Sequence, residues 1–344
     1  MICYFRVDAY QKIGTGHLVR SKIIADFLSA NKGFRCVFLV GEKSLQSAID
    51  FDVTYEVIDE DNELESICRI LDDCQSPKIL VTDGDKAIFY EETFQKTIVE
   101  SNTFLMTVTM RNEPFFHSHL VFNQNIIALD QHYKKSDYTK LLLGPEYIIL
   151  NENFRKLSPP ERIGDQNKKP NLLINFGGAD ALDLTSQVLR EVATLADQLN
   201  SVSVVVGRLY KPLDSLKHLI EALKETVDIQ LFVNTPLMPQ LMEKCDFAIT
   251  SCGLTAWELI YLKTPNMVIT TSDREKITAV ALEQEGCIVN LGHRAISASF
   301  IDDVKQGLDR RADLFDRMSN SRVVIDGNGL DRLCDEVSKL FKDI

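Results

Sequence analysis

One histidine stands where a strand-like segment of the sequence leads into a helix-like one. His17 follows the loop Gly14-Thr15-Gly16, which comes after an apolar run at residues 2–7. Glycine lets the backbone approach a ligand closely, and an imidazole, with an unperturbed pKa of about 6.5, suits proton transfer near neutrality. We therefore interpret His17 as a general base. The alternative is a helix-start histidine that bonds only to backbone.

The residues around His17 have the features of a ligand-binding loop. The N-terminus of the following helix attracts anions, and charged side chains flank the loop on both sides. The motif matches a dinucleotide fingerprint only in part, because Val19 stands at the third glycine position. The expected substrate contacts in this motif are Arg6, Asp8, Gly14, Gly16 and Arg20.

A second glycine turn follows the strand-like run at residues 171–176. Gly177 and Gly178 again allow the backbone to approach a ligand. Asp180, shortly after them, has two interpretations: a ligand contact, or a cap for the helix that starts near Leu182. We expect Gly177, Gly178 and Asp180 to contact substrate. A plain tight turn with an Asp cap is the alternative.

A third motif places a polar loop between a buried strand, at residues 247–250, and a helix. The loop begins at Ser251. A helix N-terminus at this point would direct the backbone amides of Gly253, Leu254 and Thr255 outward, as a diphosphate requires. We expect these four residues to bind substrate.

Two residues inside the helix of the third motif are further candidates. Glu258 could accept hydrogen bonds from the vicinal hydroxyls of a ribose, or could merely complement the helix dipole. Trp257, the only tryptophan of the sequence, could pack in the core or face a ligand. We count both among the expected substrate contacts.

The motifs lie within an alternation of strand-like and helix-like segments that runs along almost the whole sequence. Such an alternation predicts parallel sheets with helices on both faces, where ligands bind at the carboxyl ends of the strands. A polar stretch with paired prolines interrupts it and indicates a linker. We expect a domain at 1–157, a linker at 158–170, a second domain at 171–322, a C-terminal helix at 323–344 packed across both domains, and before it a long helix around 297–318.

Composition argues against several classes of function. The 344 residues carry a formal net charge of −12, and no basic cluster offsets it, so nucleic-acid binding is not expected. No apolar run approaches the roughly 18 residues of a membrane span, so stable membrane insertion is not expected either. The N-terminus lacks the pattern of a signal peptide, and the eight cysteines form no C-x-x-C pair. We therefore expect a cytoplasmic protein with free cysteines.

A His-Ser-His sequence at residues 117–119 is a candidate for one side of a metal site. No nearby cysteine or carboxylate completes such a site, so we interpret these residues as surface or loop histidines. We expect neither a metal nor a cofactor.

The three motifs together, in this order and spacing, resemble the UDP-sugar hydrolases of the pseudaminic-acid pathway and their spore-coat polysaccharide relatives. Those proteins are similar to the glucosaminyltransferase of peptidoglycan synthesis. The resemblance covers nearly the whole chain and includes residues 143–147, Phe154 and residues 325–329. It implies a GT-B fold, an α/β architecture of two Rossmann-like domains whose parallel sheets face each other across a cleft.

The resemblance also implies roles for the residues above. His17 matches the histidine that activates water for attack on the anomeric carbon of a UDP-linked deoxy-amino sugar, which releases free sugar and UDP. The second domain would hold the uracil near Phe232 and Val233, the diphosphate at residues 253–255 and the ribose at Glu258. The implied setting is nonulosonic-acid or surface-glycan biosynthesis, with association with other glycan-biosynthesis enzymes as a further expectation.

Among several departures from the pattern of these hydrolases, two follow strands of the first domain. Their Asp-x-Tyr element after the fourth strand is replaced by Asp83-Gly84-Asp85, with Tyr90 further on, and their acidic pair after the fifth strand is replaced by residues 107–110, which include no acid. We expect these positions to shape the sugar pocket. The alternatives to a hydrolase are therefore a GT-B glycosyltransferase with the same donor, and a catalytically weak nucleotide-sugar-binding protein.

Overall fold

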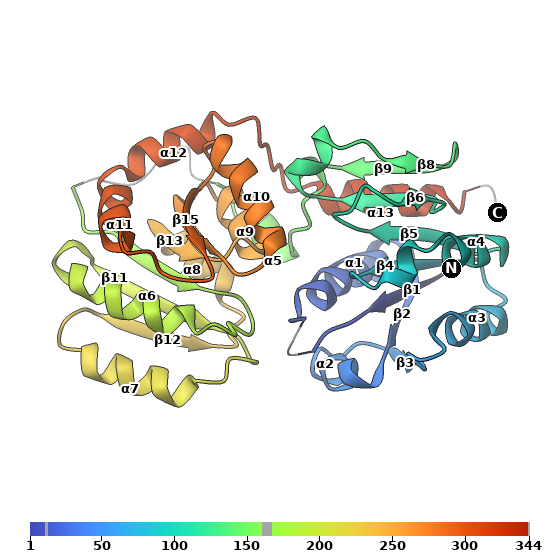
Figure 1. The fold of residues 1–344 in the computed structure, drawn as a ribbon, viewed down its shortest axis with the longest axis horizontal. Coiled ribbons are helices and arrows are strands. Elements are labelled where there is room, and N and C mark those ends of the chain that lie inside the picture. The colour runs from blue at the N-terminus through green and yellow to red at the C-terminus, as the bar shows by residue number, and fades with distance from the viewer. Residues whose placement is uncertain (11–12, 160–166, 343–344) are drawn as a thin grey trace. The chain divides into compact units, whose positions relative to one another are not determined.

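The computed structural model describes residues 1–10, 13–159 and 167–342, and the chain divides into two compact units (Figure 1). Unit 1 comprises Met1–Leu150 and Asp326–Ile344, and unit 2 comprises Asn151–Ile325. The boundary between the first segment of unit 1 and the start of unit 2 therefore lies after Leu150, before the domain boundary expected at residue 157. Of the expected linker, residues 160–166 lie outside the described residues.

Unit 1 is built on a seven-stranded sheet in which each neighbouring pair of strands is parallel. The spatial order is β3-β2-β1-β4-β5-β7-β9. The strands are β1 (Ile2–Val7), β2 (Arg35–Val40), β3 (Tyr55–Val57), β4 (Lys78–Asp83), β5 (Phe104–Val108), β7 (Leu120–Asn123) and β9 (Lys140–Leu143), and a separate pair consists of β6 (Phe115–Phe116) and β8 (Lys134–Lys135).

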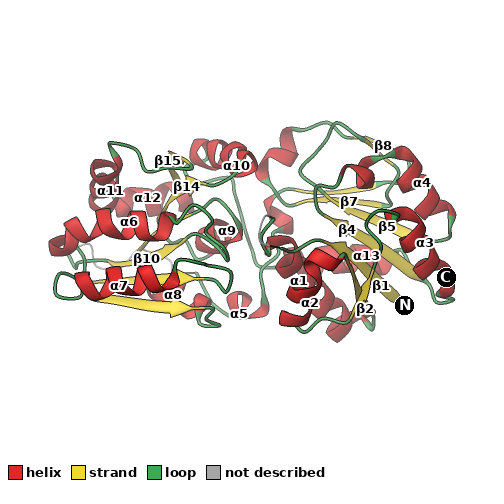
Figure 2. Cartoon of the chain, turned by 60° about the horizontal axis from the view of Figure 1, so that its bottom comes forward, coloured by secondary structure: helices red, strands yellow, loops and turns green. Residues whose placement is uncertain are grey.

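Helices cover both faces of this sheet (Figure 2). Side chains alternate between the faces of a strand, so Phe5 of β1 packs in one apolar cluster with Leu18 and Leu28, while Tyr4 packs in another with Ile67 and Phe94. Burial on both faces explains the continuous apolar runs of β1 and β4. The helices are α1 (Gly16–Lys32), α2 (Leu45–Asp50), α3 (Glu63–Asp73), α4 (Glu92–Glu100) and α13 (Gly329–Lys339).

The C-terminal helix α13 belongs to unit 1. Leu330, Leu333 and Val337 lie in the same apolar cluster as residues of α1, and the Lys32 ammonium lies 2.6 Å from the Asp335 carboxylate. Every one of these contacts is made within unit 1. The structure therefore places α13 against α1 in unit 1, and the expected packing of the C-terminal segment across both domains stays a prediction.

Unit 2 repeats the architecture with a six-stranded parallel sheet in the order β12-β11-β10-β13-β14-β15. Apolar side chains of α6 and α11 pack against the central strands. The elements are β10 (Asn171–Asn175), β11 (Ser201–Val206), β12 (Ile229–Val233), β13 (Phe247–Thr250), β14 (Asn266–Thr270), β15 (Val289–His293), α5 (Glu152–Arg155), α6 (Leu184–Val192), α7 (Leu213–Leu223), α8 (Met238–Lys244), α9 (Leu254–Tyr261), α10 (Asp273–Gln284), α11 (Phe300–Asp309) and α12 (Arg311–Ser319).

The single helix expected around residues 297–318 was a wrong prediction, because the structure breaks it into α11 and α12. Arg310, between them, has a non-helical backbone conformation (φ −104°, ψ 21°). The guanidinium of Arg311 donates 2.8 Å and 3.0 Å hydrogen bonds to the carbonyl oxygens of Leu308 and Lys168. These bonds satisfy a carbonyl at the end of α11, which makes the break favourable.

None of the described helices combines the length and the apolar character that crossing a bilayer requires. Within each unit, the parallel strands end at one common edge of the sheet. The loops after β1, β4 and β5 therefore share an edge in unit 1, and the loops after β10, β12 and β13 share an edge in unit 2.

Candidate functional site

His17 pairs with a carboxylate from another strand. It lies in the first turn of α1, and its Nδ1 is 2.7 Å from Oδ1 of Asp83, the last residue of β4. The Asp83 side chain is 1 % exposed, whereas that of His17 is 21 % exposed. β1 and β4 are neighbours in the sheet, which is why a loop after one strand meets the end of the other.

Asp83 is held in the ionised form by its neighbours. Arg20 donates from Nε to Oδ2 at 3.0 Å and from Nη2 to Oδ1 at 2.5 Å, and the Ser21 hydroxyl donates to Oδ2 at 3.0 Å. Burial alone would favour the neutral acid, but the charges of Arg20 and His17 keep the pKa of Asp83 well below its ordinary value. Arg20 is therefore committed to Asp83.

An ionised carboxylate at Nδ1 fixes the tautomer of the imidazole. Asp83 has no proton to donate, so Nδ1 of His17 carries the hydrogen and Nε2 is left with a lone pair. Within the described residues the structure gives Nε2 no hydrogen-bond partner. This geometry suits a general base whose orientation is set by a second residue.

The glycines before His17 leave open space. Gly14 has a left-handed φ of +84°, which favours glycine, and Gly16 begins α1. A Cβ built at either position would meet no heavy atom within 4 Å. Packing therefore does not fill the space beside this loop, as expected where a ligand approaches the backbone.

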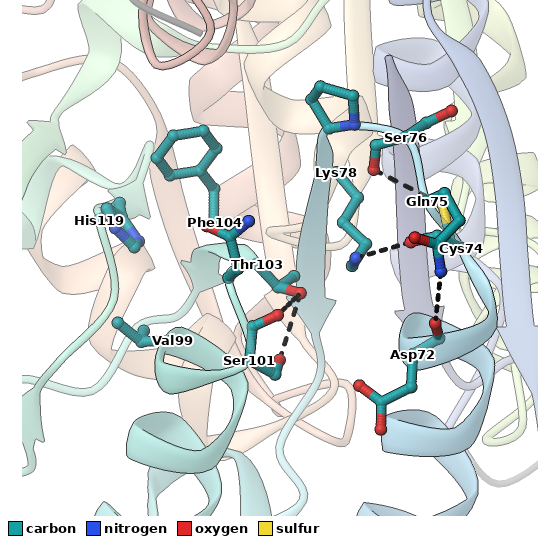
Figure 3. A pocket seen from close by; sticks show the side chains of 12 residues that line it. Asp72, Cys74, Gln75, Ser76, Lys78, Val99, Ser101, Thr103, Phe104 and His119 are labelled. Carbon is teal, nitrogen blue, oxygen red and sulfur yellow. Dashed lines mark hydrogen bonds between the residues drawn. The ribbon is translucent and has the colours of Figure 1, made fainter.

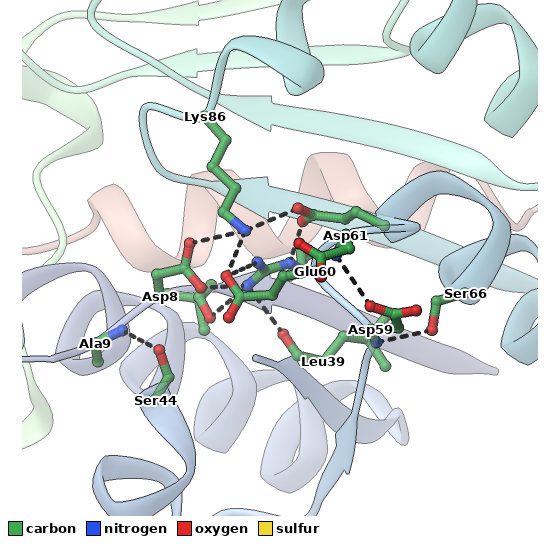
Figure 4. Close-up of polar contacts among 12 residues, drawn as sticks. Asp8, Ala9, Leu39, Ser44, Asp59, Glu60, Asp61, Ser66 and Lys86 are labelled. Atoms are coloured by element: carbon green, nitrogen blue, oxygen red, sulfur yellow. Dashed lines mark hydrogen bonds and ion pairs between the residues drawn. The ribbon is translucent and has the colours of Figure 1, made fainter. Parts of the chain in front are cut away.

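Asp8, Glu60 and Lys86 belong to a network of buried and partly buried charges (Figure 4), and Arg6 is part of the same network. Arg6 has no exposed surface; it donates to Asp8 at 2.7 Å and to Glu63 at 2.5 Å. Lys86 lies 2.8 Å from Glu60, 2.7 Å from Glu63 and 3.5 Å from Asp8. Both Arg6 and Asp8 are thus engaged by protein groups, and Arg6 offers a substrate no surface to touch.

Tyr90, one of the positions expected to shape the sugar pocket, and Arg111, which was not expected there, follow β4 and β5, the strands that end beside the His17–Asp83 pair. The Tyr90 hydroxyl donates a 3.1 Å hydrogen bond to the Gly84 carbonyl oxygen and lies 3.1 Å from Thr109 Oγ1. The Arg111 guanidinium carbon lies 4.6 Å from the centroid of the Tyr90 ring. Asp83 was expected to shape the sugar pocket, but its pairing with His17 was not expected, because that contact depends on which strands are neighbours in the sheet.

In unit 2, one buried asparagine joins two of the expected ligand loops. Asn175 ends β10, and its Oδ1 accepts hydrogen bonds from the Gly177 amide and from Thr255 Oγ1, both at 3.2 Å. Its Nδ2 donates to the Val205 carbonyl oxygen at 2.9 Å. The glycine turn of the second motif and the N-terminus of α9 are therefore held side by side.

Gly178 packs against Gly207. A Cβ at Gly207 would lie 2.4 Å from the Gly178 Cα, and the Leu209 amide donates to the Gly178 carbonyl oxygen at 3.1 Å. A side chain at position 207 would therefore displace the turn.

The two open interpretations of Asp180 and Trp257 are resolved by their contacts. The Asp180 carboxylate accepts hydrogen bonds from the Leu184 amide at 2.9 Å and the Thr185 amide at 2.8 Å, so Asp180 caps α6. Trp257 is buried in unit 2. Neither side chain is available as a ligand contact of the kind that the sequence suggested.

The N-terminus of α9 carries the remaining expected contacts. Gly253 is its N-cap, Leu254 and Thr255 form its first turn, and Ser251 lies in the preceding loop. The Glu258 side chain is half-buried, and its carboxylate has no hydrogen-bond partner among the described residues. Burial raises the pKa of its carboxyl group to about 7.

Val233, the last residue of β12, is exposed at the edge to which β10 and β13 also lead. A contact of Val233 with the nucleotide base stays a prediction.

A cavity in unit 1 lies away from all of these residues (Figure 3). It has a volume of about 480 Å³ and is lined by Lys78, Phe104 and His119 among others. Lys78 and Phe104 begin β4 and β5, so the cavity lies at the amino edge of the sheet, opposite Asp83. Its polar groups are largely engaged: Lys78 donates to the Cys74 carbonyl oxygen at 2.8 Å, and His119 Nδ1 accepts from the Leu105 amide at 3.2 Å.

Comparisons with known proteins give distant relatives and a clear fold. No protein-family model matches the chain. It is 28 % identical to the uncharacterized protein MJ1062 of Methanocaldococcus jannaschii over 78 % of this chain, and the aligned part spans about half (55 %) of that protein. It is 23 % identical to the spore coat polysaccharide biosynthesis protein SpsG of Bacillus subtilis, over 84 % of this chain and 82 % of that protein.

Solved structures match both units. Acinetobacter baumannii MurG superimposes with a TM-score of 0.68 at 12 % identity, over 98 % of this chain and 99 % of MurG. Anabaena Alr3699/HepE, whose crystal structure contains UDP, matches with a TM-score of 0.59 at 12 % identity over the full length of both chains. The chain has the GT-B fold. The GT-B fold predicted from the resemblance is therefore confirmed, with unit 1 and unit 2 as its two Rossmann-like halves.

Proposed function

We propose that this chain is a glycosyltransferase that uses a nucleotide-activated sugar, most specifically a UDP-sugar, in the biosynthesis of a glycan. The observation that carries the proposal is the His17–Asp83 pair on a GT-B fold, because it supplies an oriented base at a strand end where ligands bind in such folds. The relatives support the choice of substrate: SpsG is named for polysaccharide biosynthesis, and the Anabaena structure contains UDP.

The proposed reaction begins with proton removal. Nε2 of His17 takes the proton from an acceptor hydroxyl, and the resulting oxygen nucleophile attacks the anomeric carbon of the donor sugar. The bond between that carbon and the diphosphate oxygen breaks, and the nucleoside diphosphate leaves. Asp83 stabilises the imidazolium that forms, since it stays ionised beside Arg20.

Unit 2 is the proposed nucleotide-binding half. The backbone amides at Gly253, Leu254 and Thr255 would stabilise the charge that develops on the leaving diphosphate. The Glu258 carboxylate, which has no hydrogen-bond partner among the described residues, would accept hydrogen bonds from the ribose hydroxyls. Val233 would contact the base. Asn175 serves by holding the glycine turn against this helix N-terminus.

Hydrolysis of the UDP-sugar is the second candidate. The feature that favours it is Nε2 of His17, which has no partner in the described part of the chain, because this atom would deprotonate a water molecule as readily as an acceptor hydroxyl. The two reactions then differ only in the nucleophile. The resemblance to UDP-sugar hydrolases points in the same direction.

The experiment measures UDP release from a panel of UDP-sugars, with and without candidate acceptor saccharides. Release that requires an acceptor identifies a transferase, and release in its absence, with NMR detection of free sugar, identifies a hydrolase. We expect His17→Ala and Asp83→Asn to lower kcat by about 100-fold or more while UDP affinity is unchanged. Asp26→Asn, an exposed position on the same helix, is the matched control.

Two outcomes would count against the proposal. If calorimetry detects no UDP binding, the nucleotide-sugar assignment fails. If UDP binds and turnover occurs but His17→Ala leaves kcat unchanged, another residue is the base.

A further inference from the structure

The loop after β5 brings a cation to the edge where His17 and Asp83 lie. In the parallel pairing of β4 with β5, Asp83 is the register partner of Val108. Thr109 and Arg111 follow Val108 directly in sequence. The loop that carries Arg111 therefore begins beside the carboxylate that orients His17.

Arg111 is held in place by contacts with Tyr90 and Thr109. Its guanidinium stacks on the Tyr90 ring at 4.6 Å, and its backbone amide donates to Thr109 Oγ1 at 2.8 Å. The Tyr90 ring is in turn fixed, because its hydroxyl bonds to Gly84 and Thr109, which follow β4 and β5. A stacked guanidinium keeps its planar edge free for bidentate hydrogen bonds and loses little freedom when it binds.

The charge of Arg111 is less neutralised than that of the cations nearby. Arg20 is committed to Asp83, and Lys86 lies within 2.8 Å of both Glu60 and Glu63. Arg111 is 42 % exposed, and its ion pair is a 3.5 Å contact with Glu113, which is itself 69 % exposed. An ion pair exposed to solvent contributes little to stability, so Arg111 can exchange Glu113 for a ligand at small cost.

We propose that Arg111 binds an oxyanion, a carboxylate or a phosphate, on the part of the substrate that reacts at His17. A guanidinium donates two parallel hydrogen bonds to either group. The anion belongs either to the transferred sugar, as in a UDP-uronic acid, or to the acceptor, as in a sugar phosphate. This inference rests on the proposed function and narrows its substrate class to acidic saccharides.

The test compares acidic and neutral partners in the full-length protein. The donor arm measures the affinity ratio of UDP-glucuronic acid to UDP-glucose by calorimetry. The acceptor arm measures the ratio of glucose 6-phosphate to glucose, each as an inhibitor or acceptor in UDP release. We expect the wild type to prefer the acidic member in one arm by about tenfold or more, which assigns the anion to the donor or to the acceptor.

The variants isolate the guanidinium. Arg111→Gln should abolish the preference in that arm, Arg111→Lys should restore part of it, and affinity for UDP alone should not change. Arg35→Gln is the matched control, because Arg35 is exposed and begins β2, at the opposite edge of the same sheet. It should leave both ratios at the wild-type value.

The inference is overturned if UDP binds but the wild type shows no acidic preference in either arm, or if Arg111→Gln leaves that preference intact. An absence of UDP binding in the wild type is a different result, because it contradicts the proposed function itself.

Discussion

The orientation of the His17 imidazole depends on Asp83, a residue far from it in the sequence. The 2.7 Å contact of Asp83 with Nδ1 fixes which nitrogen carries the proton. Arg20 and Ser21 fill the remaining positions on the carboxylate. A helix-start histidine that bonds only to backbone would have neither partner.

A second residue-scale consequence concerns the pH dependence of stability. Burial raises the pKa of Glu258 from its ordinary value of 4.5 to about 7. Between these pH values the folded state holds a proton that the unfolded state has lost, so the free energy of unfolding falls as pH rises through this window. Glu258→Gln cannot ionise, and we expect it to be more stable than the wild type by on the order of 1–3 kcal/mol above pH 7 and nearly equal to it below pH 4.5.

Urea denaturation of both proteins at pH 5 and pH 8 would measure this difference. A stability gap of the same size at both pH values would contradict the prediction, because it would show that the substitution acts through packing and not through ionisation. The same variant should weaken UDP binding if Glu258 contacts the ribose.

At this scale the sequence allowed His17 to be predicted and not its partner. A histidine after a glycine loop at a helix start is a local pattern, whereas the pairing with Asp83 depends on which strands are neighbours. Asp180 is a residue whose position was predicted but whose role was not. Its local pattern fitted both a ligand contact and a helix cap, and only the hydrogen bonds to Leu184 and Thr185 distinguish them.

At the scale of elements, the charge network of unit 1 connects the loops on both sides of the candidate base. Asp8 lies directly after β1, in the segment that leads to the His17 loop. Lys86 lies in the loop that follows Asp83, the last residue of β4. The 3.5 Å contact between Asp8 and Lys86 and the shared partner Glu63 tie these loops together. The network therefore stabilises two segments that must keep a fixed spacing.

We expect Lys86→Met to destabilise unit 1 by about 1–3 kcal/mol, because it leaves a group of partly buried carboxylates without one of their two cations. Chemical denaturation at neutral pH measures the effect. Lys22→Met is the control, since Lys22 forms only an exposed pair with Asp26 on α1, and we expect a change within about 0.5 kcal/mol. Equal effects of the two substitutions would show that the network contributes no more to the free energy of unfolding than a surface ion pair does.

The alternation of strands and helices allowed the parallel sheets to be predicted, because apolar runs and amphipathic stretches are local signals. The break at Arg310 was not predictable in this way. The side chain that compensates it, Arg311, reaches Lys168 in a distant segment, and the helical pattern continues across the break. Tertiary contacts decided where that helix ends.

At the scale of the whole molecule, unit 1 is assembled from both ends of the described chain. Leu333 of α13 is fully buried in the cluster that includes α1. We expect Leu333→Ala to destabilise unit 1 by about 2–5 kcal/mol through loss of apolar contact and formation of a cavity. Hydrogen exchange followed by mass spectrometry should show faster exchange in α1 and unchanged exchange in α9. Equal acceleration in both units would contradict the assignment of α13 to unit 1 alone.

The return of the chain to unit 1 also sets an order of events during synthesis on the ribosome. Unit 2 is complete in sequence once Ile325 has been made, whereas the apolar surface that α13 covers stays open until the following residues emerge. Domains generally fold as units while the chain grows. The second half of this protein is therefore able to fold before the first half, whose apolar cluster is complete only once α13 has emerged.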